Sequence, residues 1–256
     1  MTNEGGLSVR DLTVKFGGLT AISAVTLDVP RGSLVGLIGP NGAGKTTTFN
    51  ACSGLLSPTA GTVWLDGRNM TQRSPHLRAQ AGLGRTFQKI DLFDRLSVED
   101  NVRLGYEARL ASAHLWSKFT STPSEGRAIR ERAKAALARC GISHLAPLPA
   151  GSLSTGHRRL VELARAIAGA FAILLLDEPS SGLDHDETSN FAQILTNLVQ
   201  EDGTGILLVE HDMTLVREVC ERLYVLEFGS LIATGPTREV LDSAEVRAAY
   251  LGRAVA

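Results

Sequence analysis

The sequence predicts an α/β fold with a mainly parallel sheet, an antiparallel β subdomain at the N-terminal side and an inserted α-helical subdomain. In the last third of the chain, continuous apolar runs at residues 173–176 and 206–209 alternate with amphipathic helical stretches. That alternation is typical of a parallel sheet that is buried on both faces. Residues 7–29 instead alternate apolar and polar positions, as half-buried strands do, and residues 101–170 are helical in composition.

The predicted strands of the first third surround one glycine-rich turn. Phe16-Gly17-Gly18 divides residues 7–29 into two strands, and residues 61–65 and 82–85 predict two short ones. Apolar residues 35–38 predict a buried strand that runs directly into the glycine-rich turn, and a helix over about residues 45–52 follows.

This turn matches the phosphate-binding pattern G-x-x-x-x-G-K-[ST] from Gly39 to Thr46. Its glycines let the main chain approach an anion, and the helix N-terminus adds favourable N–H groups. The lysine of such a loop reaches the β- and γ-phosphates, and the hydroxyl that follows it binds Mg²⁺. Strand, spacing and helix agree, so a P-loop NTPase core that binds ATP or another nucleoside triphosphate is favoured over a fortuitous glycine-rich loop. The residues predicted to bind the nucleotide here are Gly39, Pro40, Asn41, Gly42, Ala43, Gly44, Lys45, Thr46 and Thr47.

Two adjacent carboxylates, Asp177 and Glu178, follow the apolar strand at residues 173–176. Ligands bind at the carboxyl edge of open α/β sheets, so this pair is expected beside the phosphates. Asp177 is expected to hold Mg²⁺ directly or through water, and Glu178 to polarise the attacking water. The alternative, an acidic turn that merely ends a strand, is less favoured because a phosphate loop is present.

The helical block begins near residue 97, with helices predicted over residues 101–110, 127–140 and 155–170. Residues 111–124, which include Trp116 and Phe119, predict a loop-like insertion. Those aromatics could form a docking surface or pack on their own subdomain.

The basic face of the middle helix is interpreted as a solvated surface rather than as a site for an anionic partner. It comprises Arg127, Arg130, Arg132 and Lys134.

After the acidic pair, helices are predicted over residues 187–200 and 214–220, and strands over residues 223–228 and 231–234. We therefore expect a single domain with three parts. They are an ATPase core with its β subdomain (residues 1–96 and 171–236), a helical subdomain (97–170) and a C-terminal helical tail (237–256).

The stretch Leu153-Ser154-Thr155-Gly156-His157 opens the third predicted helix of the block. A serine just outside a helix and a glycine in its first turn make a second anion site. With the other motifs in chain order, this stretch resembles the signature sequence of the ATP-binding cassette (ABC) family, usually Leu-Ser-Gly-Gly-Gln. Thr155 and His157 depart from that pattern.

The resemblance to this family covers nearly the whole chain. It implies that Phe16 stacks on adenine, that Gln88 is the switch glutamine, catalytic and a Mg²⁺ ligand, and that His211 is the switch histidine. It also implies an ATPase that works as a head-to-tail dimer, in which Ser154, Thr155, Gly156 and His157 of one subunit contact ATP on the other. Asp184, in the loop Ser181-Gly182-Leu183-Asp184, would pass the state of one site to the other.

Three stretches are similar to the ATP-binding subunits of branched-chain amino-acid importers, especially to the larger of that system's two ATPase subunits. They are residues 84–93 with Arg85-Thr86-Phe87-Gln88, the insertion at residues 111–124 and the tail Ala249-Tyr250-Leu251-Gly252. This resemblance implies a homodimer or a heterodimer with a second ATP-binding subunit, which grips transmembrane permease subunits through a groove beside Gln88. An extracytoplasmic solute-binding protein would be an indirect partner, and the subunit would lie at the cytoplasmic face of the inner membrane.

Several alternatives stay open within and outside the family. A urea or other small-solute importer, or a lipopolysaccharide exporter that shares the tail, would use a similar ATPase. A non-transport member would carry two cassettes or a long coiled coil, and a P-loop kinase would lack the stretch at residues 153–157.

Composition narrows the partners further. The 256 residues include 26 basic and 27 acidic side chains, so no global field attracts nucleic acid. An odd number of cysteines, 3, without C-x-x-C spacing argues against a disulfide framework or a zinc site and favours a reducing, cytoplasmic compartment. We expect no secretory signal in residues 1–8. The apolar run at residues 166–176 is shorter than the roughly 20 residues that a membrane span needs.

Overall fold

The computed structural model describes residues 5–113 and 123–251 of the chain. A six-stranded sheet forms the centre of the molecule. The strands β10, β9, β3, β8, β7 and β6 lie side by side in that order. All neighbours pair in parallel except β9 and β10, which confirms the mainly parallel sheet. The strands are β3 (Leu34–Ile38), β6 (Leu83–Arg85), β7 (Ile173–Asp177), β8 (Gly205–Val209), β9 (Arg222–Glu227) and β10 (Ser230–Pro236).

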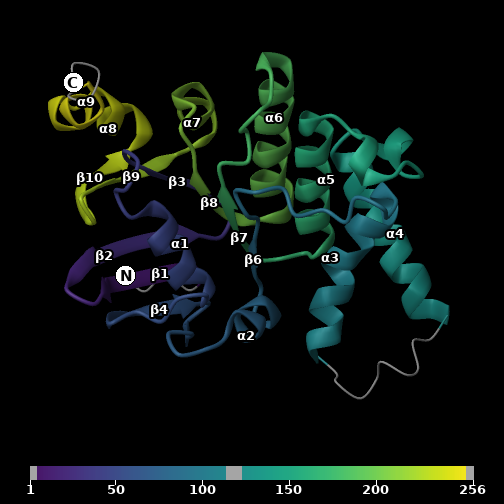
Figure 1. Ribbon diagram of the computed structural model, residues 1–256, viewed down its shortest axis with the longest axis horizontal. Helices are drawn as coiled ribbons and strands as arrows, with labels where there is room; N and C mark the ends of the chain where they lie inside the picture. Colours follow the sequence, from purple (N-terminus) through teal and green to yellow (C-terminus); the bar gives the residue numbers. More distant parts are fainter. Residues whose placement is uncertain (1–4, 114–122, 252–256) are drawn as a thin grey trace.

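A second, antiparallel sheet packs against the first one at the N-terminal side (Figure 1). Its order is β2, β1, β4 and β5, and a long hairpin joins the first two strands at Gly17 and Gly18, as predicted. The strands are β1 (Gly6–Phe16), β2 (Leu19–Pro30), β4 (Ala60–Leu65) and β5 (Arg68–Asn69).

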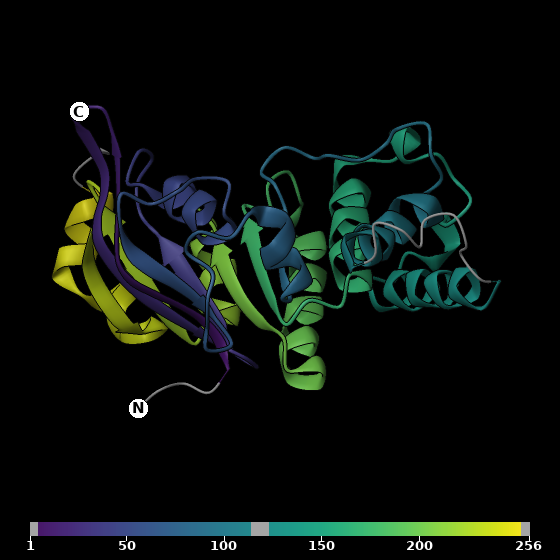
Figure 2. The same cartoon turned by 90° about the horizontal axis from the view of Figure 1, so that it is seen from below.

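Helices α3, α4 and α5 form a block at one end of the molecule, and α8 and α9 lie at the other end beside β10 (Figures 1 and 2). Helices α6 and α7 cover one face of the central sheet, and α1 lies between its other face and the antiparallel sheet. The helices are α1 (Lys45–Ser53), α2 (Pro75–Gln80), α3 (Val98–Ala113), α4 (Pro123–Arg139), α5 (Thr155–Ala168), α6 (His185–Asp202), α7 (Met213–Val219), α8 (Thr237–Asp242) and α9 (Ala244–Leu251).

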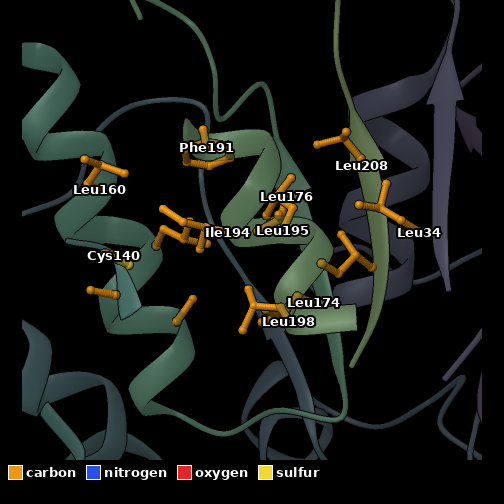
Figure 3. Close-up of a cluster of buried hydrophobic side chains, with 14 of the residues drawn as sticks. Leu34, Cys140, Leu160, Leu174, Leu176, Phe191, Ile194, Leu195, Leu198 and Leu208 are labelled. Atoms are coloured by element: carbon orange, nitrogen blue, oxygen red, sulfur yellow. The ribbon is translucent and has the colours of Figure 1, made fainter. Parts of the chain in front are cut away.

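The strands of the central sheet divide their side chains between two cores. In β7, Leu174 and Leu176 pack with α5 and α6 on one face, whereas Ile173 and Leu175 pack on the other face. Figure 3 shows the first core, in which the apolar side of α6 (Phe191, Ile194, Leu195, Leu198) lies between α5 and the strands. Because both faces are covered there, β3, β7 and β8 are buried along their whole length, which agrees with the apolar runs of the sequence at residues 35–38, 173–176 and 206–209.

Helix α2 and strand β5 were not predicted, and one prediction was wrong at its ends. Helix α2 begins after Ser74, whose hydroxyl accepts a hydrogen bond from the backbone N–H of Leu77, and β5 pairs with β4. The loop-like insertion predicted for residues 111–124 is helical at both ends, because α3 continues to Ala113 and α4 begins at Pro123. Trp116 and Phe119 lie outside the described residues.

No helix within residues 5–113 and 123–251 has both the length and the apolar character that crossing a membrane requires. The division into core, helical subdomain and tail at residues 96, 170 and 236 stays a prediction.

Candidate functional site

The glycine-rich turn between β3 and α1 needs its glycines for close approach. Gly39 has φ 151°, and a Cβ built there would lie 2.1 Å from the carbonyl oxygen of Leu226. Gly44, the residue before α1, has φ 104°, and its Cβ would lie 2.6 Å from the Cγ2 of Ile22. A larger residue at either place would push the turn away from the strands beneath it.

Lys45 is buried in the first turn of α1, and its Nζ lies inside the glycine-rich turn. The ammonium donates hydrogen bonds to the carbonyl oxygens of Gly39, at 2.6 Å, and Pro40, at 3.0 Å. Burial lowers the pKa of Lys45, while the nearby carboxylates of Glu178 and Asp177 oppose that shift. A cation is therefore held where the motif expects phosphate oxygens.

Gln88, Glu178 and His211 meet in one hydrogen-bonded cluster, although they follow three different strands. The Gln88 side chain donates from Nε2 to Oε2 of Glu178 at 2.7 Å, and Nε2 of His211 lies 2.9 Å from Oε1 of the same carboxylate. Glu178 has φ 49°, and its backbone N–H donates to the carbonyl oxygen of Val209 at 2.8 Å. The end of β8 thus fixes the position from which the Glu178 carboxylate extends.

Asp177 is buried at the carboxyl end of β7, where its Oδ2 lies 3.3 Å from a guanidinium nitrogen of Arg85. Burial raises the pKa of Asp177, and Arg85 opposes this by stabilising the ionised form. A carboxylate, the Thr46 hydroxyl and the Gln88 amide are oxygen donors of the kind that Mg²⁺ prefers.

No group of three or more His, Cys, Asp or Glu side chains in the described part of the chain could hold a metal by itself. A Mg²⁺ site that uses one carboxylate and relies on nucleotide phosphates fits this finding, because Mg²⁺ is usually bound by one or two carboxylates plus substrate phosphates.

The predicted signature residues form the N-terminus of α5. Ser154 caps this helix, since its hydroxyl accepts a hydrogen bond from the backbone N–H of His157 at 3.3 Å. The Nδ1 of His157 lies 3.1 Å from the same hydroxyl oxygen. Thr155 faces Gly182, because a Cβ on Gly182 would lie 3.1 Å from the Cγ2 of Thr155.

Within one chain, this helix end is not brought to the phosphate loop. Helix α5 belongs to the helical block, whereas α1 lies against the antiparallel sheet on the other side of β6 and β7 (Figures 1 and 2). Asp184 caps α6, and its carboxylate accepts from the backbone N–H of Glu187 at 2.8 Å. Phe16 ends β1 with 52% of its surface exposed.

Sequence reasoning missed a buried charged pair on α5. Arg159 and Glu162 are 7% and 4% exposed and lie 3.1 Å apart. Arg159 donates to the carbonyl oxygen of Gln88 at 2.8 Å, and Glu162 accepts from the backbone N–H of Asp91 at 3.0 Å. The available signal was two opposite charges three residues apart within an otherwise apolar helix face.

Glu210, which precedes His211, was missed as well. It is 3% exposed, and its carboxylate accepts from the backbone N–H groups of Ser180, at 2.8 Å, and His211, at 3.1 Å. Glu210 therefore connects the backbone at Ser180, which follows Glu178 in the chain, with the backbone at His211, whose side chain contacts Glu178.

A groove of about 640 Å³ lies between the core and the helical block, beside Gln88. Its lining is mainly apolar, and the charged residues that line it are Arg85, Asp91, Glu107, Glu162 and Arg165. The larger apolar side chains that line it are Leu55, Leu83, Phe87, Phe93, Leu104 and Phe171.

Comparison with known proteins gives one consistent family. The sequence profile described as ABC transporter matches residues 22–181. The high-affinity branched-chain amino acid transport ATP-binding protein LivG of Salmonella typhimurium is 38% identical over 251 residues, which cover 97% of this chain and 98% of LivG. The lipopolysaccharide export system ATP-binding protein LptB of Haemophilus influenzae is 36% identical over 246 residues, which cover 96% of this chain and 97% of LptB.

Two solved structures share the fold over nearly their whole length. The ADP conformation of MJ1267, an ATP-binding cassette of an ABC transporter, has a TM-score of 0.84 at 27% identity and covers 97% of this chain and 99% of that chain. The dimeric structure of MJ0796, a bacterial ABC transporter cassette, has a TM-score of 0.78 at 27% identity and covers 91% and 99%.

Proposed function

The chain belongs to the ABC transporter family and is an ATP-hydrolysing subunit of that type, and we propose that it powers the uptake of branched-chain or other hydrophobic amino acids. The observation that carries the catalytic part is the Glu178 carboxylate, which Gln88 and His211 hold from two sides next to the phosphate loop. The similarity to LivG over 97% of the chain supports the substrate class.

ATP binding is assigned to the turn from Gly39 to Thr47. Lys45 is charged and is bonded to two carbonyl oxygens of the turn, so arriving phosphate oxygens offer it stronger, charge-assisted partners. The exposed ring of Phe16 at the end of β1 would stack on the adenine base. Thr46, Asp177 and Gln88 would hold Mg²⁺, which neutralises phosphate charge when bound.

Hydrolysis is assigned to Glu178 as the group that accepts a proton from the attacking water. Gln88 and His211 contact the two carboxylate oxygens of Glu178, one each. A γ-phosphate would draw the imidazole and the amide toward itself and leave one oxygen of Glu178 to orient water. Glu210 holds the backbone N–H of His211, which limits where that imidazole can move.

A complete site requires two subunits in this proposal. The N-terminus of α5, with Ser154, Thr155, Gly156 and His157, lies away from the phosphate loop of its own chain (Figure 1). A head-to-tail dimer would place it on the ATP of the other subunit, where the helix N-terminus favours an anion. MJ0796, of the same fold, is a dimer in its solved structure. Asp184, next to this region, would report on the neighbouring site.

The groove beside Gln88 is the proposed contact for transmembrane permease subunits, through which the chain would be held at the cytoplasmic face of the membrane. Its exposed aromatic side chains, Phe87 and Phe93, support this assignment. An extracytoplasmic binding protein would supply the solute. Lipopolysaccharide export is the second candidate, because LptB is nearly as similar as LivG.

Reconstitution tests this function. The chain should be purified together with candidate permease subunits and a candidate solute-binding protein from the same organism and placed in proteoliposomes. We expect ATP-dependent accumulation of leucine that the Glu178→Gln variant abolishes. ATP-dependent release of lipopolysaccharide without leucine uptake would instead favour the export function.

A further inference from the structure

Arg85 is the last residue of β6 and joins three parts of the site through one buried guanidinium. Its side chain is 9% exposed. One terminal nitrogen lies 3.3 Å from Oδ2 of Asp177, and the other donates to Oδ1 of Asn50 at 2.7 Å and to the hydroxyl of Ser53 at 2.9 Å. Asn50 and Ser53 belong to α1, the helix that begins at Lys45. The guanidinium therefore connects the end of β7 with the phosphate-loop helix.

The same guanidinium lies over two aromatic rings. Its central carbon is 5.7 Å from the centre of the Phe49 ring and 5.1 Å from that of Phe87. Phe49 is buried, whereas Phe87 is 43% exposed and lines the groove. The Nε of Arg85 is buried and has no hydrogen-bond partner among the described residues. Burial of a guanidinium with one unbonded nitrogen costs free energy of folding, which favours a role for Arg85 beyond packing.

We propose that Arg85 is a positioning residue for the metal site, because it fixes the Asp177 carboxylate in the orientation that receives Mg²⁺. Phe87, which contacts the Arg85 guanidinium and lines the groove, connects this interaction to the groove. This inference rests on the proposed function of Asp177 as a Mg²⁺ ligand. Arg85 engages Oδ2 and leaves Oδ1 as the oxygen available to a cation. Hydrogen-bond partners of a metal ligand typically change metal affinity by about 10- to 100-fold when removed.

Arginine is needed here because one planar fork bonds Asp177 and α1 at once. A lysine has a single nitrogen at this distance and would reach either Asp177 or the pair on α1. A methionine would leave Asp177 buried without its cation. We therefore expect the metal contribution to nucleotide binding to fall in the order wild type, Arg85→Lys, Arg85→Met.

The test measures the Kd for ATP in Mg²⁺ and in EDTA, in a Glu178→Gln background that prevents turnover. The Kd in EDTA divided by the Kd in Mg²⁺ reports how much the metal contributes to ATP binding. In Arg85→Met we expect this ratio to fall by about tenfold or more, with the Kd in EDTA nearly unchanged. An unchanged ratio overturns the role of Arg85. If the background protein itself gains nothing from Mg²⁺, the proposed metal site fails instead.

Arg78 gives a matched control for a purely structural effect. It is 1% exposed and donates to the carbonyl oxygens of Ala51, Cys52 and Thr71, so it supports the end of the same helix without touching Asp177. Arg78→Lys is expected to lower the melting temperature and leave the ratio unchanged. A ratio that falls equally in Arg78→Lys and Arg85→Lys would show that α1 stability, and not Asp177, is responsible.

The link to the groove is tested by two aromatic substitutions. Phe87 and Phe93 both line the groove, but Arg85 has its ring contacts with Phe49 and Phe87. Phe87→Leu should lower the ratio by about threefold, because it removes a cation–π contact of about 0.5–1 kcal/mol. Phe93→Leu should leave it unchanged, and equal effects of the two would overturn the link.

Discussion

The guanidinium of Arg159 donates a hydrogen bond to the carbonyl oxygen of Gln88, 2.8 Å away. The same group lies 3.1 Å from Glu162 and 3.4 Å from the carbonyl oxygen of Ser181. Helix α5, which begins beside Ser154, is thereby joined to the loop that carries Gln88 and to the loop that leads to Asp184. A shift of α5 in the proposed closure of a dimer on ATP would therefore move Gln88, which contacts Glu178.

Breaking this buried pair should be costly. Arg159→Met removes the nearest cation from the buried Glu162 carboxylate and leaves it the weaker contact with Arg165 at 4.0 Å, so we expect the free energy of unfolding to fall by about 3–5 kcal/mol. Arg159→Met with Glu162→Met should recover part of the loss. Urea unfolding of the two single variants and the double variant measures the coupling. Strictly additive effects would mean that the two charges do not stabilise each other.

Removal of the Glu178 charge should stop turnover and spare binding. In Glu178→Gln, the amide cannot accept the proton from water, so we expect phosphate release to fall at least about 100-fold. ATP affinity should be retained, and dimers should accumulate in ATP because the nucleotide is not consumed. Phosphate release and size-exclusion chromatography measure these results. Unchanged ATPase activity would refute the assignment of Glu178.

Loss of the Lys45 ammonium should weaken nucleotide binding itself. Hydrogen bonds to charged groups contribute about 1.5–3 kcal/mol, so Lys45→Ala is expected to raise the Kd for ATP roughly 10- to 100-fold. Lys134→Ala is the matched control, because Lys134 is exposed and pairs with Glu131 far from the turn. Equal affinities of the two variants would count against the phosphate cradle.

The sequence alone predicted both sheets and most helices because their patterns are local. Continuous apolar runs predicted β3, β7 and β8, and the alternation of apolar and polar residues at positions 7–29 predicted the β1–β2 hairpin. Helix α2 was missed although Ser74-Pro75 is a start signal, because its six residues are too few to show a period.

Motifs with fixed spacing located the phosphate loop and the acidic pair, and the family resemblance added Gln88 and His211. Arg85 and Arg159 were out of reach for such reasoning. Their partners lie on other elements, and nothing in the sequence states that Arg85 will lie 3.3 Å from Asp177, a residue 92 positions away. Which side chain lies across from a charged one is decided by tertiary packing.

Stability should depend on pH through Glu210. Burial raises the pKa of this carboxylate above its ordinary value of 4.5, although the backbone N–H groups of Ser180 and His211 oppose the shift. The ionised form therefore disfavours the fold, and stability due to this group is lost as the pH rises through the raised pKa. The free energy of unfolding of the wild type minus that of Glu210→Gln should thus fall as the pH rises above the ordinary value of 4.5 and through the raised pKa, as urea unfolding can measure.

Asp66 provides a control of opposite sign. Its hydrogen bond with Arg31 lowers the pKa of Asp66 below the ordinary value of 3.8. Its contribution is present above that value and is lost as the pH falls through the lowered pKa. The corresponding difference for Asp66→Asn should rise with pH, and a Glu210 difference that also rises would contradict the assigned shift.

The groove aromatics predict where permease subunits bind. Phe93 is 57% exposed in the groove wall, and an aromatic anchor at an interface typically costs about 2 kcal/mol or more when truncated. We expect Phe93→Ser to reduce the fraction of the chain that co-purifies with tagged permease subunits by more than about tenfold. Leu148→Ser is the matched control, because Leu148 is 41% exposed but is not among the residues that line the groove. Since both changes remove one exposed apolar side chain, equal recovery of the two variants would place the permease contact elsewhere on the surface.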